Sequence, residues 1–289
     1  MCVSAAWILN PYSFYILSIK SHAITQDVTE LNEVPYVAQD FLFSVVVPTY
    51  CEEQNIERCL ESIRKQVFVE GRVETIVVDS DSPDRTRAIA RRYADKVVNM
   101  KDRGVGKARN LGARKAAGEF LVFVDADTVL DSKFLAGIHE ALNRSNAVYV
   151  VGTMAGLEWS GTADNLLKFL HYGLVNLIST VTAHLGFPFF PTVCCACKKT
   201  AFRKVGGFDE DLAIAEDLKF SLRMGKIGRC LVSRRAKAYT SLRRIQKNGM
   251  IKNSYMYLSN YFKVFILNKR PWITEFPHTS ETQDGRLIS

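Results

Sequence analysis

Apolar and polar positions follow two repeating patterns from about residue 41 onward. Largely apolar runs at 41–47, 73–78 and 119–124 are each followed by a proline or an aspartate, which is typical of buried parallel strands. Between the runs, apolar residues recur at helical spacing, so that one helix is expected to bury Ile56, Cys59, Leu60, Ile63 and Val67. The succession predicts an α/β fold with a mostly parallel sheet flanked by helices and a ligand crevice at its carboxyl edge.

Further elements continue this alternation. We expect a short strand at 96–98, a helix from 106 to 117, a helix marked by Leu135, Ile138 and Leu142, a strand at 147–152, a strand at 193–197, a short helix at 200–205 and a helix from about Glu216. Ser82-Pro83 resembles an N-cap followed by proline at the first helical position.

Residues 164–190 are mostly apolar but include Lys168, His171, Asn176 and His184. This number of polar side chains disfavours a transmembrane helix, and one or two helices of the folded domain are expected instead. Two roles stay open for this segment: contact with an apolar, lipid-like acceptor, or the ordinary packing of core helices.

Charge divides the chain unevenly. Its 289 residues carry a net charge of +8, and no Asp or Glu occurs between Asp217 and Glu275, a stretch that holds fourteen Lys and Arg residues. Such a stretch predicts an anionic partner, such as a nucleotide diphosphate or acidic lipid, or else a solvated basic surface. A nucleic-acid partner is disfavoured by the acidic residues of the expected crevice.

Three regions are expected: an extension at 1–40, a catalytic domain at 41–240, and a basic, aromatic helix and tail at 241–289. Residues 1–19 have no charged side chain, which fits either a weak membrane anchor or a poorly structured leader. The helix expected at about 246–267 contains tyrosines, phenylalanines and lysines, a composition typical of helices that lie on a membrane surface. A cytoplasmic protein with peripheral membrane contact is the resulting expectation.

The seven cysteines include a crowded group, Cys194, Cys195 and Cys197, in an apolar stretch. No Cys-x-x-Cys pair occurs, so that packing in a buried strand is a better interpretation than a zinc site. The odd number and uneven spacing also argue against a secreted disulfide framework and favour a reducing compartment.

Two acidic signatures carry the candidate chemistry. Asp125-Ala126-Asp127 ends an apolar strand, and Glu216-Asp217 comes about ninety residues later. Carboxylate oxygens at a strand end suit Mg²⁺ or Mn²⁺ bridging a diphosphate. A second carboxylate on another segment can then serve as a base.

Five segments in order resemble the motifs of family 2 glycosyltransferases, over about residues 41 to 250. They are Pro48-Thr-Tyr-Cys-Glu-Glu53, Val78-Asp-Ser-Asp-Ser-Pro-Asp-Arg-Thr86, Arg103-Gly-Val-Gly-Lys-Ala-Arg-Asn110, Gly118 through Asp127, and Gly206-Gly-Phe-Asp-Glu210 with Glu216-Asp217. The resemblance implies the GT-A fold, a nucleotide-sugar donor, a divalent Mn²⁺ or Mg²⁺ ion, and transfer with inversion at the anomeric carbon.

The resemblance also implies roles for individual residues. Asp217 would be the general base, Glu216 would orient the acceptor, and Asp127 with Asp125 would hold the metal. Nucleotide-sugar contacts would come from Pro48, Thr49, Tyr50, Glu52, Asp79, Arg103, Lys107, Arg109, Asp125, Ala126, Arg243 and Arg244. Gly206 and Gly207 would permit a tight bend and close approach to the donor sugar.

Structural alternatives stay open for these residues. Asp79 could form an Asx-type turn or a helix cap, although that role suits Ser82 and Asp84 better. Arg103, Lys107 and Arg109 could be solvated on an exposed helix, and Asp125 and Asp127 could be turn residues. Glu216 and Asp217 could simply place negative charge in the first turn of a helix.

Two departures from the family pattern bear on the donor site: Cys51 stands where Asn is usual, and Ser80-Asp81 replaces Asp-Gly. The absence of a Q-x-x-R-W motif argues against a processive synthase. The expected function is therefore transfer of a sugar from a UDP- or GDP-sugar to a hydroxyl or phosphate of a lipid-linked or glycan acceptor. The alternatives are a transferase acting on a soluble protein or small molecule, and a nucleotide-sugar-binding protein without catalysis.

Overall fold

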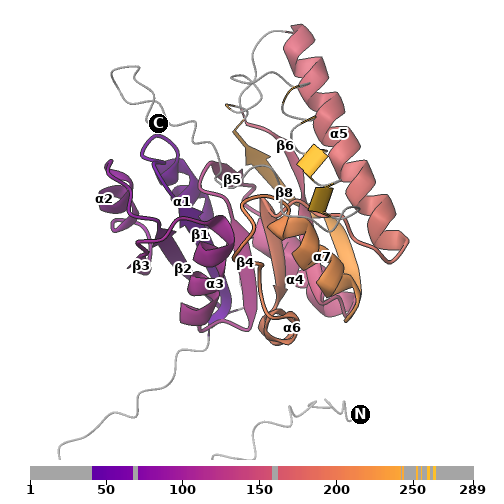
Figure 1. The fold of residues 1–289 in the computed structure, drawn as a ribbon, viewed down its shortest axis with the longest axis horizontal. Helices are drawn as coiled ribbons and strands as arrows, with labels where there is room; N and C mark the ends of the chain where they lie inside the picture. The colour runs from indigo at the N-terminus through magenta and orange to yellow at the C-terminus, as the bar shows by residue number, and fades with distance from the viewer. Residues whose placement is uncertain are drawn as a thin grey trace, which may run out of the picture. The chain divides into compact units, whose positions relative to one another are not determined.

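The computed structural model describes residues 41–67, 71–157 and 162–241, and beyond these residues 243, 252, 255, 259, 260, 263 and 264. Its strands are β1 (Phe41–Thr49), β2 (Arg72–Asp79), β3 (Lys96–Asn99), β4 (Phe120–Val124), β5 (Thr128–Leu130), β6 (Tyr149–Gly156), β7 (Cys194–Lys198) and β8 (Cys230–Thr240). Its helices are α1 (Ile56–Arg64), α2 (Thr86–Ala90), α3 (Val105–Lys115), α4 (Phe134–Arg144), α5 (Thr162–His184), α6 (Lys199–Val205) and α7 (Glu216–Gly225). Figure 1 shows these elements along the chain.

All eight strands form one mixed sheet in the order β3-β2-β1-β4-β7-β6-β8-β5. The first four strands are parallel, and their register pairs Thr49 with Asp79, so that the carboxyl ends of β1 and β2 lie side by side. In the second half, β7 runs antiparallel to β4 and β6, β8 runs parallel to β6, and β5 runs antiparallel to β8. The expected α/β sheet is confirmed, with a mixed second half.

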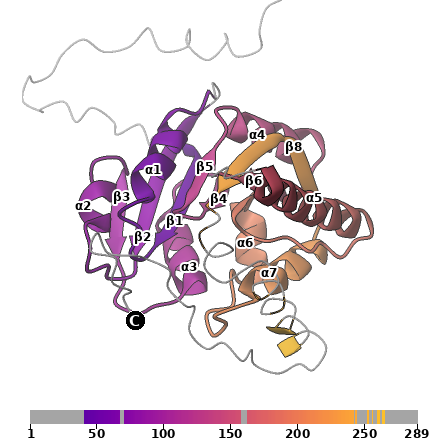
Figure 2. The same cartoon turned by 90° about the horizontal axis from the view of Figure 1, so that it is seen from above.

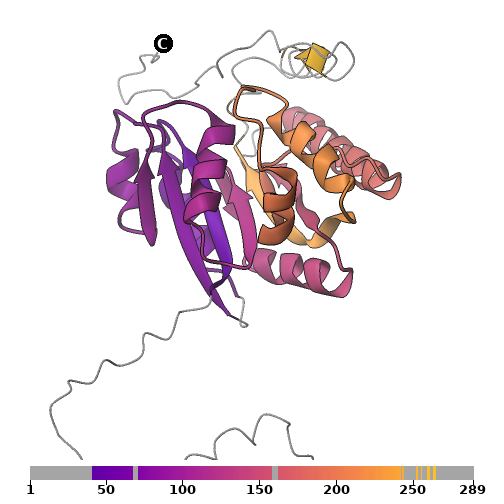
Figure 3. The ribbon, with the colours of Figure 1, turned by 60° about the horizontal axis from the view of Figure 1, so that its bottom comes forward.

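Helices cover both faces of this sheet (Figure 2). Apolar side chains of α1, α2, α4 and α5 pack against one face, in a core that includes Leu60, Ile138 and Tyr172. The other face carries α3, α6 and α7, with Phe202 and Phe220 in its core, and Figure 3 shows these helices together in magenta and orange. Because each face has its own apolar layer, β1, β2 and β4 are buried on both sides over most of their length, as their largely apolar runs predicted.

Several expected elements differ in detail. The helix after β2 begins at Thr86 rather than at Ser82-Pro83, because Asp84 Oδ1 accepts a hydrogen bond from the Thr86 N–H at 3.0 Å, while Ser82 is bound to Asp79. Val67 lies beyond the end of α1 and is 61% exposed, so that its assignment to the buried face was wrong.

In the second half of the sheet, segment 164–190 contributes one helix, and β5 was not expected because its three residues carry no periodic signal. Strand β8 extends through the basic residues Arg234 and Arg235, which are exposed while Ala236 and Ala238 are buried. The helix expected at 246–267 and the extension at 1–40 lie outside the described residues, and the three-region division stays a prediction.

The six cysteines that the structure describes are all buried, and none of these six forms a disulfide. Cys194, Cys195 and Cys197 lie in β7, which confirms their packing in a buried strand. Among the described helices, none combines the length and apolar character needed to cross a bilayer.

Candidate active site

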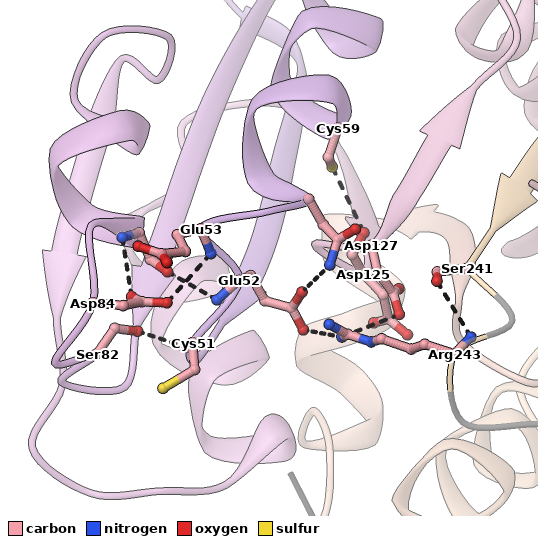
Figure 4. A network of polar contacts seen from close by, with 12 residues as sticks. Cys51, Glu52, Glu53, Cys59, Ser82, Asp84, Asp125, Asp127, Ser241 and Arg243 are labelled. Atoms are coloured by element: carbon pink, nitrogen blue, oxygen red, sulfur yellow. Dashed lines mark hydrogen bonds and ion pairs between the residues drawn. The ribbon is translucent and has the colours of Figure 1, made fainter. Parts of the chain in front are cut away.

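The segments that follow β1 and β4 meet at a cluster of charged side chains. Arg243 Nη2 donates to Glu52 Oε1 and, at 3.4 Å, to Asp127 Oδ2. Figure 4 shows Glu52, Asp127 and Arg243 directed toward one another, with Asp125 beside them. Burial raises the pKa of Glu52, and the Arg243 guanidinium opposes that rise. Three residues that the sequence assigned to the donor and metal sites are thereby brought together, whereas Arg244 lies outside the described residues.

The turn after β1 depends on an unusual backbone conformation at Cys51. Its φ is +53°, in the left-handed region that asparagine tolerates better than most residues. Its N–H donates to Ser82 Oγ at 3.0 Å, and the next N–H, of Glu52, donates to Thr86 Oγ1 at 2.8 Å. This conformation gives a physical reason for asparagine as the family's usual residue, and here a network from the β2 side holds cysteine in the same turn.

Thr49 and its neighbours differ in what they offer a ligand. The Thr49 side chain is buried, and its Oγ1 has no hydrogen-bond partner within the described part of the chain. Pro48 pairs with Val78 inside the sheet, and Ala126 is 4% exposed within the core of the α1 face. Pro48 and Ala126 can therefore offer mainly backbone atoms, while the Thr49 hydroxyl is an unsatisfied polar group at the strand end.

Asp79 ends β2 in a fully buried position. Its Oδ1 accepts from the Ser82 N–H at 2.9 Å, its Oδ2 accepts from Ser82 Oγ at 2.5 Å, and Arg87 Nε lies 3.3 Å from Oδ1. The carboxylate thus closes the turn after β2, which is the Asx-type alternative. A carboxylate has further acceptor sites, so that the contact of Asp79 with the nucleotide sugar stays a prediction.

Arg103 lies just before α3, and Lys107 lies in its first turn. Arg103 Nη2 donates to the Tyr50 hydroxyl at 2.5 Å, and its guanidinium lies 4.4 Å from the centre of the Tyr50 ring. Lys107 Nζ pairs with Asp102 at 3.5 Å. Both side chains remain accessible to solvent, so they can still bind phosphate.

Arg109 has a different environment from the one expected. It is 3% exposed rather than solvated, and it donates to Asp125 Oδ1 at 2.8 Å and to Glu216 Oε1 at 3.0 Å. Burial disfavours its charge, but the two carboxylates raise the pKa of Arg109 above its usual range. The solvated alternative for Arg109 was therefore wrong, because this residue links the acidic signature after β4 to the one that begins α7.

Glu216 and Asp217 form the first turn of α7, after Ala215 in the left-handed region at φ +72°. Burial raises the pKa of Glu216 to about 8, with Asp217 adding to the rise and Arg109 opposing it. Asp217 is half-buried, and burial likewise raises its pKa, to about 6, while the Arg109 guanidinium opposes the rise. A carboxylate with its pKa near neutrality can accept a proton efficiently at physiological pH.

The loop before α7 is held by Asn110, a residue for which no role was predicted. Asn110 Oδ1 accepts from the Phe208 N–H at 2.8 Å, and its Nδ2 donates to the Phe208 carbonyl and to Glu210 Oε1, both at 2.9 Å. A Cβ on Gly207 would lie 2.6 Å from Asn110 Oδ1, whereas one on Gly206 would meet nothing within 4 Å. The tight bend expected at Gly206 and Gly207 is present. Asn110 is the last residue of the third motif, and its place in that motif was the one sign in the sequence that it has a role.

The carboxylates fit a metal shared with a ligand better than one held by protein alone. Within the described ranges, no group of three or more His, Cys, Asp and Glu side chains is arranged to hold an ion. A cation nevertheless suits the position, since the Arg243 guanidinium already pairs there with Asp127 and Glu52. Mg²⁺ and Mn²⁺ commonly take one or two carboxylates and complete their shell with phosphate oxygens and water. Asp127, with Asp125, fits that role.

Comparison with known proteins agrees with this geometry. Residues 44–206 match the model of Glycosyl transferase family 2. The chain is 30% identical over 190 residues to the poly(ribitol-phosphate) beta-N-acetylglucosaminyltransferase TarS of Staphylococcus aureus, an alignment that covers 63% of this chain and 32% of the relative. It is 26% identical over 171 residues to the Escherichia coli UDP-Glc:alpha-D-GlcNAc-diphosphoundecaprenol beta-1,3-glucosyltransferase WfgD, covering 52% and 65%.

Two solved structures share the fold. Residues 1–349 of S. aureus TarS in complex with UDP-GlcNAc superpose with a TM-score of 0.54 at 27% identity, covering 70% of this chain and 58% of that one. The mannosyltransferase PcManGT of Pyrobaculum calidifontis, solved with GDP-Man and Mn²⁺, gives a TM-score of 0.61 at 22% identity, covering 81% and 66%. The expected GT-A fold is confirmed, and the chain belongs to glycosyltransferase family 2.

Proposed function

We propose that this chain transfers a sugar from a UDP- or GDP-sugar to an acceptor hydroxyl or phosphate, with inversion at the anomeric carbon. The observation that carries the proposal is the connection from Asp127-Ala126-Asp125 through buried Arg109 to Glu216-Asp217. One end of this connection suits a donor diphosphate with its cation, and the other end has a carboxylate with a raised pKa. A nucleotide-binding protein without catalysis would not need the second end.

In the proposed reaction, Asp217 accepts the proton of the acceptor hydroxyl while the acceptor oxygen forms a bond to the anomeric carbon. The bond from that carbon to the diphosphate oxygen breaks on the opposite face, and the electron pair leaves with the nucleoside diphosphate. Glu216 orients the acceptor beside Asp217, and Arg109 holds Glu216 in position. Asp127 and Asp125 would hold Mn²⁺ or Mg²⁺, which supplies positive charge to the departing diphosphate.

The donor contacts in this proposal come mostly from the β1 to β4 half of the sheet. Thr49 ends β1, Tyr50 and Glu52 follow it, and Asp79 ends β2. Arg103 and Lys107 supply positive charge near the start of α3. UDP-GlcNAc is bound in the TarS structure, and GDP-Man is bound in PcManGT. Both nucleotides therefore belong in the first experiment.

A lipid-linked or glycan acceptor at the cytoplasmic membrane face is the preferred acceptor class. The name of WfgD specifies a diphosphoundecaprenol acceptor, and that of TarS a poly(ribitol-phosphate) acceptor. The basic stretch from residue 218 to 274 offers the matching positive charge for such anionic acceptors. A soluble protein or small-molecule acceptor is the competing candidate.

The test is release of nucleoside diphosphate from a panel of UDP- and GDP-sugars, with Mn²⁺ or Mg²⁺, and with or without a membrane lipid extract. Wild type is compared with Asp127→Ala and Asp217→Asn. Metal-dependent release from one donor, raised by the lipid extract and lost in both variants, is the expected result. Release that both variants retain would contradict the site assignment, and release raised by soluble acceptors alone would favour the competing acceptor class.

A further inference from the structure

Helix α5 is attached to the sheet by specific contacts on one side. Tyr172 is buried, and Val175 packs against the core beneath the helix. The Asn176 side chain makes two hydrogen bonds to the backbone of β6, accepting from the Met154 N–H at 3.0 Å and donating to the Met154 carbonyl at 2.9 Å. Ser179 Oγ donates to the Phe189 carbonyl at 3.1 Å. These contacts determine which face of α5 points away from the domain.

The outward face is apolar along the length of the helix. Side chains at helical spacing on this face are between 39% and 67% exposed: Leu166, Phe169, Leu170, Leu174, Leu177, Ile178, Val181 and Leu185. From Leu166 to Leu185 the helix axis extends about 28 Å. Phe187 and Phe189, at 51% and 36% exposure, continue the surface beyond the helix end. We call these ten residues the α5 apolar face.

Helix α4 shows that this arrangement is particular to α5. Both helices contact β6 and β8, and α4 buries Phe134, Ile138 and Leu142 while Glu140 and Arg144 form an ion pair on its outer side. α4 is therefore built to meet water, whereas α5 presents large apolar groups where α4 has charges. Contiguous apolar surface of this kind marks a site of contact with a protein or a membrane.

Charge around the α5 apolar face favours an anionic membrane. No Asp or Glu occurs from residue 165 to 208. At the C-terminal end of the helix, Gly186 and Pro188 pack against Gly225, and the exposed Lys226 and Arg229 follow directly. Apolar residues flanked by basic ones are the combination with which amphipathic helices lie in the headgroup region of anionic bilayers.

We infer that the α5 apolar face docks on the surface of an anionic lipid bilayer, with its leucines and phenylalanines in the boundary between headgroups and acyl chains. The helix lies on the bilayer rather than crossing it, because its other face is bonded to β6. This contact goes beyond the proposed reaction and does not require it. For a lipid-linked acceptor, docking would keep the enzyme on the surface where that acceptor is found.

The test is flotation of the full chain with phosphatidylcholine vesicles, with and without phosphatidylglycerol. Leu177→Glu is compared with Val67→Glu, because the two side chains are 58% and 61% exposed and the charge change is the same. Wild type and Val67→Glu should float with the anionic vesicles. Leu177→Glu should lower the bound fraction about ten-fold or more, because a leucine would no longer be buried in the lipid.

Three results would overturn the inference: no binding by wild type, equal binding by the two variants, or an α5-dependent dimer in the absence of vesicles. Circular dichroism melting of each variant checks that it is folded, and Leu170→Glu, two turns away on the same face, should repeat the effect of Leu177→Glu. Nucleoside diphosphate release without lipid should be equal in Leu177→Glu and wild type. Loss of vesicle binding and loss of the proposed reaction are thereby measured separately.

Discussion

The turns after β1 and β2 are held differently from the loop that leads into α7. Cys51 bonds Ser82, and Glu52 bonds Thr86, across separations of 31 and 34 residues between neighbouring parallel strands. Arg109 reaches Glu216 across 107 residues, and Asn110 reaches Phe208 across 98. The turns of the donor side are therefore held between adjacent strands, although Arg243 also reaches Glu52 from 191 residues away, whereas the segment that carries the candidate base is held by contacts of this distant kind. The two regions should fail in different ways when they are changed.

The largest expected effect separates the base from the donor side. Asp217→Asn removes the proton acceptor without a change in size, and kcat for transfer should fall about 10²- to 10⁴-fold. Donor affinity, measured by calorimetry, should be unchanged. Asp211→Asn, an exposed aspartate in the loop before α7, is the control and should transfer at the wild-type rate.

Loss of Arg109, which links the two regions, should clearly lower the free energy of unfolding. Arg109→Met leaves Asp125 and the buried Glu216 carboxyl without their shared hydrogen-bond donor and should lower the free energy of unfolding by about 2–4 kcal/mol. Arg114→Met on the same helix removes an exposed pair with Glu210 at 3.6 Å and should cost at most about 1 kcal/mol. Equal urea midpoints for the two variants would contradict the role given to Arg109.

Much of the donor side could be predicted from the sequence, because each motif follows an apolar strand and parallel strands bring their carboxyl ends to one edge. The burial of Arg109 could not be predicted, since the spacing of α3 gives no information about what covers it. The turn role of Asp79 and the anchoring role of Asn110 likewise depend on partners in other segments. The outward apolar face of α5 could not be predicted either, because the spacing of apolar residues does not show which face of a helix packs against the sheet.

The paired glycines offer a narrower test of the long-range contacts. Both have positive φ, so Gly206→Ala should cost about 1 kcal/mol from backbone conformation alone. Gly207→Ala should cost about 3 kcal/mol, since its Cβ would also displace Asn110 from Phe208. The measurement is thermal unfolding of the two variants, and similar melting temperatures would show that Asn110 does not hold this loop.

The smallest effect concerns pH. Burial raises the pKa of Asp217 to about 6, so that its carboxylate is protonated below that pH and available as a base above it. Transfer measured as kcat/KM should rise with pH to a plateau above about 7 and fall about ten-fold for each unit below the pKa. Donor affinity should not show this fall at low pH. A value of kcat/KM that is constant between pH 5 and pH 7 would contradict the role of Asp217 as the proton acceptor.

The separate roles of the donor side and the base are tested most directly by measuring donor binding and transfer together in Asp127→Ala and Asp217→Asn. Asp127→Ala should lose the Mn²⁺-dependent part of donor affinity and should also transfer poorly. Asp217→Asn should bind the donor with Mn²⁺ as wild type does and yet fail to transfer. Equal loss of donor affinity in both variants, or normal transfer by Asp217→Asn, would contradict the division between a donor side and a base that distant contacts hold in place.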